Sequence, residues 1–426
     1  MEGGSGDYKV GCGWSRSQIP QVWKIGPCNF GIAHSLSSCG VDKVSGLNFF
    51  KPVKLRCQYL KAAQVLTLCI KRRVMQQINT VLLSYGVSGK VFHAPFLQMH
   101  PGYRLAGAWE RSQQRIGLDY AGLRSYASLQ EILNDPAIEL MIVNTPTHTH
   151  YDYARAALEA GKNVVVEKAF TITVAEAMEL DAIAKEKRLV LSVFHNRRWD
   201  SDFSTVRDVV RGAMLGTVHT AEFSFHRYRP LIGAKAHFEN PGPGAGLLND
   251  LGPHLIDQAL SLFGMPRAVS AVLRSLRSNT QVDDAFDIQL NYPQLLVTLS
   301  AGTLVHQSGP AYVLYGREAS FIQERNDRQE AKLKAGLRPD SPEWNKEPAL
   351  QSGVLFSQRD GVMHRESIPN SRVSYLDYYE ALFAALTAGA ETPVSAADGI
   401  RVMQIIEAAR QSDATNARVL VHELAL

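Results

Sequence analysis

The fold follows from residues 80–89, Thr-Val-Leu-Leu-Ser-Tyr-Gly-Val-Ser-Gly, and from the pattern that continues after them. Residues 80–84 form a short apolar run typical of a buried strand, and Gly86 and Gly89 mark a tight turn. Helical spacing follows over residues 90–99. A strand, a glycine turn and a helix in this order predict the first unit of an α/β domain.

The same alternation continues to about residue 199. We expect strands at Tyr103–Glu110, Leu140–Asn144, Asn163–Glu167 and Leu189–Val193. The intervening helices are marked by a capping box at Ser128–Glu131, by a helix His150–Ala160 ended by Gly161, and by a second capping box, Thr173–Glu176, whose helix runs to Lys187. Short Val, Ile and Leu runs between helices predict a parallel, doubly wound sheet.

The rhythm changes after Asp200. Val218–Tyr228 alternates like a strand with one exposed face, and a helix is expected at Leu247–Phe263. Further strands are expected at Ala268–Arg274, Phe286–Tyr292, Leu295–Gly302 and Ala311–Gly316, then loop with short helical pieces over 323–350, then helices Tyr375–Ala388 and Ala396–Gln411. We therefore predict a Rossmann dinucleotide-binding domain over 76–199, and an α+β domain with an open, mostly antiparallel sheet over 200–426, which binds substrate and forms oligomers.

Residues 1–75 differ from the rest in charge and in cysteine content. The chain has 45 Lys and Arg and 41 Asp and Glu. Residues 1–75 hold 11 of the basic and 3 of the acidic residues. The rest of the chain, called the body below, therefore holds 34 basic and 38 acidic residues. All five cysteines lie here: Cys12, Cys28, Cys39, Cys57 and Cys69. The segment is open to three interpretations: sequence upstream of a true start at Met75, a targeting segment, or an accessory region. We expect it to pack poorly.

The body has the composition of a cytoplasmic protein. It is mildly acidic, which gives no electrostatic case for nucleic-acid binding. It has no cysteine, so no disulfide framework or cysteine zinc site is expected. No apolar run reaches the ~18 residues that a membrane span needs. The sequence thus indicates neither a membrane, nor a nucleic acid, nor a metal as a partner.

The glycine turn is the first candidate binding site. After a first strand, Gly86, Val87, Ser88 and Gly89 lie where a dinucleotide fold binds pyrophosphate at a helix N-terminus, although Ser84 stands at the first glycine of the G-x-G-x-x-G fingerprint. The same turn also occurs in ordinary α/β folds.

The end of the second strand bears on the choice of dinucleotide. Glu110 ends that strand 24 residues after Gly86, where an acid can bind the ribose hydroxyls of NAD. Arg111 and Ser112 follow directly and could instead hold the 2′-phosphate of NADP. We expect NAD or NADP, with NAD slightly favoured.

Three residues form the candidate catalytic group. Lys168 follows the valine strand, at the carboxyl end where open α/β sheets bind ligands, and can place positive charge beside a developing alkoxide. Asp250 and His254 are spaced i, i+4, so a helix places them on one face. His254 suits a general base, and Asp250 could fix its tautomer or bind a hydroxyl. Each residue also has a possible non-catalytic role. Lys168 could simply be exposed to solvent. Asp250 could cap a helix while His254 packs in the core, or the two could be metal ligands that lack a third.

Two more segments are expected to face the substrate. Residues 195–200, His-Asn-Arg-Arg-Trp-Asp, follow the last strand of the first domain, so Asn196 and Arg197 are candidate contacts. Adjacent residues of an extended chain point to opposite sides, so at most one of Arg197 and Arg198 should face the substrate. Tyr228, near the end of the alternating strand, is a further candidate. Salt bridges between domains are the alternative role for these residues.

Taken together, the motifs resemble the Gfo/Idh/MocA oxidoreductases. The resemblance covers about residues 77–425, and it rests on residues 86–95, Glu167-Lys168, residues 195–200 and Asp250-x-x-x-His254. Residues 195–199, 228–230 and 250–258 look most like the scyllo-inositol 2-dehydrogenase branch.

The resemblance implies an NAD(P)-dependent dehydrogenase acting on CH–OH groups of a polyol or sugar. It implies a homodimer or homotetramer that associates through the sheet face of the second domain. Lys168, Asp250 and His254 match the family's catalytic trio, with His254 as general acid and base. Cofactor contacts are expected from Thr145, Pro146, His150, Glu167 and Lys168, besides the glycine turn and residues 110–111.

Two features depart from the family pattern. Ala169 replaces a proline that often has a cis bond, so the bend is either kept or Lys168 is placed differently. Ser84 replaces a glycine, which would loosen cofactor binding. The alternative functions are a non-catalytic dinucleotide-binding regulator and an enzyme that uses a retained cofactor transiently.

Overall fold

The computed structural model of the chain describes residues 77–110, 114–233, 236–344 and 352–422. The basic segment predicted over residues 1–75, together with Arg111 and Ser112, lies outside these ranges. In the described part, no helix is both long and apolar enough to cross a membrane.

The first sheet has six parallel strands in the order β3-β2-β1-β4-β5-β6. The strands are β1 Ile78–Leu82, β2 Tyr103–Trp109, β3 Arg124–Tyr126, β4 Leu140–Val143, β5 Asn163–Glu167 and β6 Leu191–Phe194. The predicted doubly wound sheet is thus confirmed, and β3 is an added edge strand. The order of strands reverses between β1 and β4, and ligands of open α/β sheets bind at the carboxyl ends of such a strand pair.

The helical segments of this part are η1 Gly89–His93, α2 Ala94–Met99, α3 Ile116–Asp119, α4 Leu129–Asn134, η2 Thr147–Thr149, α5 His150–Glu159 and α6 Val174–Lys187. The single helix predicted over 90–99 begins as a π-helix, since the N–H of Ala94 bonds the carbonyl of Gly89 five residues earlier. The capping box at Thr173 is complete. At Ser128 only half of it forms, because Glu131 turns to the N–H of Ala127.

The second sheet has nine strands in the order β14-β13-β12-β11-β7-β10-β9-β8-β15. They are β7 Val218–His226, β8 Ala268–Arg274, β9 Ala285–Asn291, β10 Leu296–Gly302, β11 Tyr312–Gly316, β12 Ala319–Gln323, β13 Gly353–Arg359, β14 Val362–Ile368 and β15 Val419–Leu420. Only β7 and β10 pair in parallel, so the predicted mostly antiparallel sheet is confirmed. The sequence pattern did not predict β12 to β15.

The helices of the second part are η3 Asn196–Trp199, α7 Ser201–Arg211, α8 Ala236–Glu239, α9 Leu247–Asp250, α10 Gly252–Phe263, α11 Gln329–Lys334, α12 Tyr375–Ala388 and α13 Ala396–Thr415. The helix predicted over 247–263 is therefore wrong as one unit, because it breaks at Leu251. Pro253 causes the break: it has no N–H to donate, and its ring crowds the carbonyl four residues earlier.

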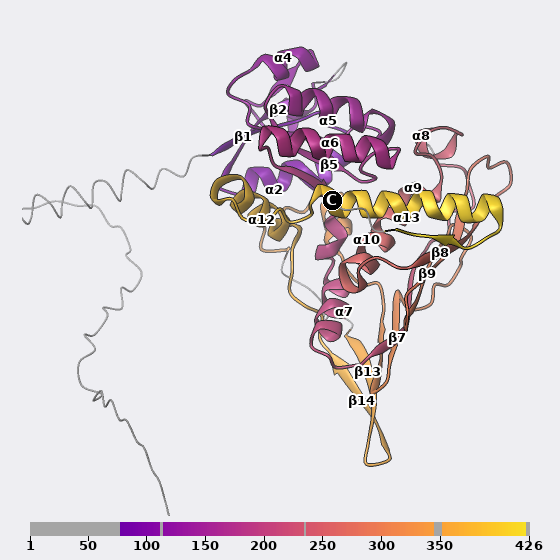
Figure 1. The fold of residues 1–426 in the computed structure, drawn as a ribbon. Coiled ribbons are helices and arrows are strands. Elements are labelled where there is room, and N and C mark those ends of the chain that lie inside the picture. The colour runs from indigo at the N-terminus through magenta and orange to yellow at the C-terminus, as the bar shows by residue number, and fades with distance from the viewer. Residues whose placement is uncertain (1–76, 111–113, 234–235, 345–351, 423–426) are drawn as a thin grey trace, which may run out of the picture. The chain divides into compact units, whose positions relative to one another are not determined.

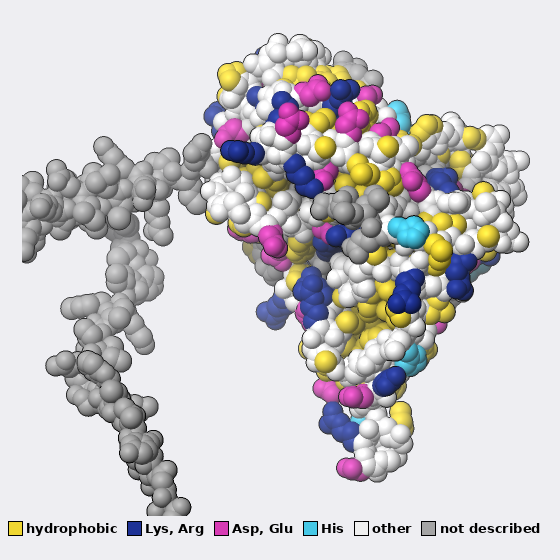
Figure 2. Space-filling view, in the orientation of Figure 1, with side chains coloured by type: hydrophobic (Ala, Val, Ile, Leu, Met, Phe, Trp, Pro, Cys, Tyr) yellow, Lys and Arg dark blue, Asp and Glu magenta, His cyan; other side chains and the backbone are white. Residues whose placement is uncertain are grey.

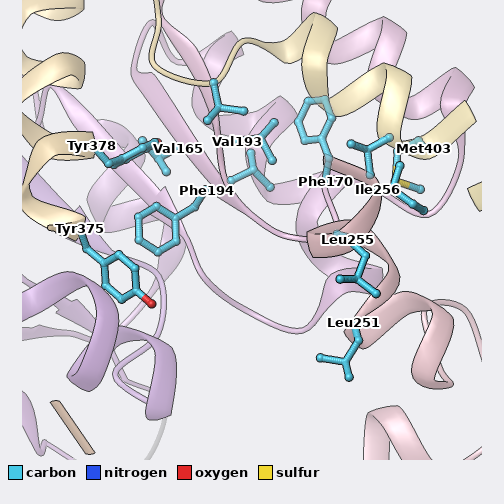
Figure 3. Close-up of a cluster of buried hydrophobic side chains, with 14 of the residues drawn as sticks. Val165, Phe170, Val193, Phe194, Leu251, Leu255, Ile256, Tyr375, Tyr378 and Met403 are labelled. Carbon is cyan, nitrogen blue, oxygen red and sulfur yellow. The ribbon is translucent and has the colours of Figure 1, made fainter. Parts of the chain in front are cut away.

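The long helix α13 joins the two sheets, since it contacts α6 on one side and β8 and α10 on the other (Figure 1). Figure 3 shows Leu255 and Ile256 of α10 and Met403 of α13 in one apolar cluster with Val193 and Phe170 from the first sheet's side. A Cβ atom at Gly399 of α13 would lie 2.7 Å from Val193. This close packing fixes α10, which carries His254, against the strand ends of the first sheet.

Candidate active site

A cavity of about 560 Å³ opens at the carboxyl ends of the first sheet's strands. Its lining comes from the turn after β1, from residues 144–147 after β4, from Glu167 and Lys168 at the end of β5, and from residues 194–197 after β6. The second sheet's side contributes Arg227, Arg229, Gly233, residues 237–239, the α9–α10 junction and α11. The predicted residues Gly86, Val87, Ser88, Thr145, Pro146, Asn196, Arg197, Asp250 and His254 all line it.

The glycine turn is held tightly where Ser84 replaces glycine. The Ser84 Oγ atom accepts a hydrogen bond from the Gly86 N–H, at 3.2 Å. The Asn144 side chain accepts from the Ser84 N–H at 2.9 Å and donates to its carbonyl at 2.8 Å. Gly89 does not line the cavity, but a Cβ there would lie 2.3 Å from the Ser84 carbonyl. The expected loosening at Ser84 is therefore not what the geometry shows.

Glu110 is a correction to the predicted ribose contact. Its carboxylate accepts hydrogen bonds from the backbone N–H groups of Arg115 (2.9 Å) and Ile116 (3.0 Å) and from the Ser125 hydroxyl (2.9 Å). It does not line the cavity. These three bonds use most of the four acceptor sites of a carboxylate, so Glu110 caps the start of α3 instead of facing a ribose.

Glu167 supports the floor of the site. It accepts hydrogen bonds from the Ser88 hydroxyl and from His93, whose Nε2 atom lies 3.1 Å away. Burial raises the pKa of Glu167, but the contacts with His93 and Ser88 outweigh this effect and lower the pKa to about 2. Glu167 therefore joins the turn after β1 to the end of β5 as an ionised group.

Lys168 and Asp250 meet across the cavity. The Lys168 Nζ atom donates to the Asp250 carbonyl oxygen at 2.7 Å and to its Oδ1 atom at 2.9 Å. The peptide bond between Lys168 and Ala169 is cis, so the bend is kept without proline. An ammonium group has three N–H donors, and these two contacts leave one for a substrate oxygen.

His254 lies beside this pair, in the first turn of α10. Its backbone N–H bonds the carbonyl of Leu251 and not that of Asp250, which is why the Asp250 carbonyl is available to Lys168. Its ring is buried, and within the described residues the Nδ1 atom has no hydrogen-bond partner. Asp250 therefore does not fix the His254 tautomer, and binds Lys168 instead.

The environment keeps His254 neutral. Burial lowers its pKa well below 6.5, and the positive charges of Lys168, Arg197 and Arg227 lower the pKa further. A neutral imidazole retains a lone pair that can accept a proton, so His254 is suited to act as a base at neutral pH.

The two adjacent arginines take different roles. Arg197 lines the cavity, where it contacts Asp200 at 3.1 Å and also Glu330. Arg198 points away and forms a two-pronged pair with Asp257, at 2.8 and 2.6 Å. The structure thus places only Arg197 of this pair at the cavity.

Two further predicted contacts do not reach the cavity. Tyr228 is half exposed and stacks on His306, with 3.7 Å between ring centroids. His150 is buried, with one ring nitrogen 2.9 Å from the Thr145 carbonyl and the other 2.9 Å from the Ala169 carbonyl. His150 therefore links the segments after β4 and β5 and supports the site from behind.

Arg227 and Arg229 line the cavity, as expected of the segment 227–229 that ends the alternating strand, and strand alternation places such i, i+2 residues on the face opposite to Tyr228. Other lining residues were not predicted from the sequence. Phe238, whose ring centroid lies 5.7 Å from the Lys168 Nζ, follows a loop with no periodic signal. Glu330 and Lys334 come from α11, in a segment read as loop.

Comparison with known proteins agrees with this architecture. Residues 78–195 match the family described as "Oxidoreductase family, NAD-binding Rossmann fold", and residues 207–421 match "Oxidoreductase family, C-terminal alpha/beta domain" of the same group.

Two relatives match over most of their length. The chain is 39% identical to the scyllo-inositol 2-dehydrogenase (NADP(+)) IolW of Bacillus subtilis, over 84% of this chain and 99% of that protein. It is also 39% identical to the uncharacterized oxidoreductase YdgJ of Escherichia coli, over 78% and 94%.

Solved structures show the same fold. An oxidoreductase of Bacillus subtilis, yvaA, has a TM-score of 0.79 at 38% identity, covering 82% of this chain and all of that one. One from Bacteroides fragilis has a TM-score of 0.74 at 42% identity, over 81% and 100%. The chain belongs to the Gfo/Idh/MocA family of oxidoreductases, with an NAD-binding Rossmann domain followed by the family's C-terminal α/β domain.

Proposed function

We propose that the protein is an NADP-preferring dehydrogenase that interconverts a secondary alcohol and a ketone on a polyol or sugar. The observation that carries the proposal is the convergence of Lys168, Asp250 and neutral His254 at one cavity lined by the glycine turn. The name of the Bacillus relative, a scyllo-inositol 2-dehydrogenase, supports the same class of substrate.

The three side chains have complementary roles in this proposal. His254 takes the proton of the reacting hydroxyl, and in the reverse direction it returns this proton to the oxygen. The third N–H of Lys168 donates to the same oxygen and stabilises the negative charge that develops there. Asp250 keeps the ammonium in place through two contacts, at 2.7 and 2.9 Å.

The residues present fit a nicotinamide dinucleotide. Gly86 lines the cavity, where a Cβ would lie at ordinary contact distance, 3.4 Å, from the Ser84 Oγ atom, and the first turn of a helical segment presents backbone N–H groups to an anion. We assign the pyrophosphate to residues 86–88 and the nicotinamide end to the side of Lys168, with Thr145 and Pro146 between them. When bound, the nicotinamide supplies the acceptor for the hydrogen that leaves carbon with its electron pair.

The preference for NADP rests on Glu110. Its carboxylate is engaged by Arg115, Ile116 and Ser125 and does not line the cavity, so we do not place it against a 2′-phosphate. Arg111 is the nearest cation in the sequence after β2. The Bacillus relative is also named as an NADP(+) enzyme.

We further propose a homodimer or homotetramer that associates through the second sheet. Figure 2 shows hydrophobic side chains gathered over the strands of this sheet on the visible face. Tyr315 of β11 is 39% exposed and Val272 of β8 is 51% exposed, values high enough to favour a covering partner. Light scattering of the purified protein tests this assignment, and a monomer at micromolar concentration would contradict it.

The catalytic assignment is tested by turnover. Purified protein is mixed with NADP or NAD and a panel of inositols, aldoses and sugar acids, and formation of the reduced cofactor is followed by absorbance. We expect turnover with at least one compound, faster with NADP. Cofactor binding without turnover on any compound would indicate a non-catalytic dinucleotide-binding protein instead.

A further inference from the structure

The charges that line the cavity do not balance. Each acidic lining side chain has a cationic or histidine partner: Glu167 with His93, Glu239 with Arg277, Glu330 with Arg197 and Lys334, and Asp250 with Lys168. Arg227 and Arg229 also line the cavity. Arg227 shares the Asp250 carboxylate with Lys168, and Arg229 has no carboxylate partner among the described residues.

Arg227 is the more informative of the two. Its side chain is only 21% exposed, and its guanidinium lies over the Phe225 ring, 4.6 Å from the centroid. The nearest carboxylate oxygen is Oδ2 of Asp250, at 3.8 Å, and Asp250 already holds Lys168. Within the described residues, the Arg227 side chain makes no hydrogen bond.

Such a group is costly to bury unless something compensates its charge. Burial lowers the pKa of Arg227 to about 10; the Asp250 carboxylate opposes this shift, and the neighbouring Arg229 and Arg197 add to it. Arg227 still carries its charge at neutral pH. Its five N–H donors in a planar fork match the two oxygens of a carboxylate.

We propose that Arg227 forms a subsite for a carboxylate group of the substrate, so that the preferred substrates are sugar acids and not neutral polyols. This inference rests on the proposed dehydrogenase function and narrows its substrate class. It places the carboxylate of the substrate beside Asp250, on the side of Arg227, and the reacting hydroxyl at Lys168 and His254.

The wider electrostatics of the site agree with this proposal. Lys168, Arg197 and Arg227 together lower the pKa of His254, which shows that the field at the base is positive. A substrate carboxylate would reduce this field, whereas a neutral polyol would leave it uncompensated. The cofactor's pyrophosphate is a second possible source of negative charge, but we assign it to residues 86–88 after β1, whereas Arg227 follows β7 of the second sheet.

The test compares matched pairs of substrates. Glucose and glucuronate differ only in having a hydroxymethyl or a carboxylate group, and glucose 6-phosphate and scyllo-inositol serve as further probes. We expect kcat/KM for glucuronate to exceed that for glucose about tenfold or more in the native protein, the factor expected of a charge-assisted hydrogen bond. In Arg227→Gln the ratio should fall to within about threefold of unity. Arg227→Lys should lie between the two.

Arg211→Gln is the matched variant. Arg211 is exposed at the end of α7 and does not line the cavity, so the ratio should stay within about threefold of the native value. The KM for NADP and the melting temperature are measured on every variant. A raised KM for NADP in Arg227→Gln with an unchanged substrate ratio would assign the charge to cofactor binding and overturn the proposal.

The remaining outcomes separate this inference from the proposed function. If glucose or scyllo-inositol is oxidised as well as glucuronate or better, the carboxylate subsite is wrong although the dehydrogenase stands. Preference for glucose 6-phosphate over glucuronate also overturns the carboxylate assignment. If no compound of the panel is oxidised, the proposed function itself fails.

Discussion

The Lys168 ammonium contacts Asp250 at two atoms, 2.7 Å from its backbone carbonyl and 2.9 Å from its Oδ1. The first contact exists because Pro253 breaks the helix, which frees a carbonyl that an unbroken helix would use for the N–H of His254. The helix break at α9–α10 and the end of β5 are thus joined through the Lys168 side chain.

Replacing the lysine should therefore damage catalysis more than stability. In Lys168→Met we expect kcat/KM to fall by about 100-fold or more, because the developing oxyanion loses its charged donor. Steady-state kinetics on the best substrate of the panel measures this fall. Lys185→Met, which removes an exposed lysine on α6, is the control and should change kcat/KM by less than about twofold. Equal effects of both substitutions would contradict the role of Lys168.

The lowered pKa of His254 sets the pH dependence. A base works in its deprotonated form, and burial together with three cations lowers the pH at which His254 gains a proton. In the direction of alcohol oxidation, kcat/KM should therefore stay level from neutral pH down to pH 6.5 and fall only below it. A pH profile whose acid limb has its midpoint at or above pH 6.5 would show that the base is a histidine in an ordinary environment.

The effects of Glu110 and Arg111 on the preference between NADP and NAD can be measured separately. Glu110→Gln removes a charge that already faces protein donors, so the ratio of kcat/KM for NADP and NAD should change by less than about threefold. Arg111→Ala should lower kcat/KM for NADP about tenfold or more and leave that for NAD nearly unchanged. A large gain for NADP in Glu110→Gln would mean that Glu110 does face the ribose.

Two glycines offer a test of how α9 is positioned. Gly246 and Gly264 have φ of +86° and +71°, so alanine is strained at either position. A Cβ at Gly246 would also lie 2.1 Å from the Asp283 Oδ1, whereas nothing lies within 4 Å of one at Gly264. Because Asp283 accepts from the N–H groups of Leu247 and Leu248, Gly246→Ala should shift α9 and Asp250 with it.

Both alanine variants should lower the free energy of unfolding, by about 1 kcal/mol for the backbone conformation. Only Gly246→Ala should lower kcat as well. Thermal melting and kinetics on the pair measure the two effects separately. If Gly264→Ala loses as much activity as Gly246→Ala, the loss follows from backbone strain and not from displacement of Asp250.

Much of this architecture could be predicted from the sequence, because it depends on local periodicity. The valine strand 163–167 and the helix from Thr173 have the predicted bounds, since apolar runs and capping boxes are local signals. The strands β13 and β14 were missed because β14 is exposed almost throughout and lacks an apolar face. The two strands form a hairpin with each other, and only β13 pairs with an earlier strand, β12, a contact that no local pattern records.

The site residues also fall into those with a local sequence signal and those without one. Lys168 was placed correctly because strand ends are readable, and the structure brings it to Asp250 and His254. Tyr228 was predicted to contact the substrate. The alternation of side chains along the strand instead places its neighbours Arg227 and Arg229 at the cavity. The role of Glu110 depends on a loop that turns back onto it, with donors five and six residues later, and that loop has no periodic signal.

The most direct test of the account is His254→Ala, measured for turnover and for NADP affinity on the same preparation. His254 touches the reaction only through the proton, so turnover should fall about 100-fold or more while the dissociation constant for NADP stays within about twofold. His219→Ala, which alters an exposed histidine of β7, is the control and should resemble the native protein. Turnover that survives in His254→Ala, or NADP affinity that collapses with it, would contradict the assignment of His254 as the catalytic base.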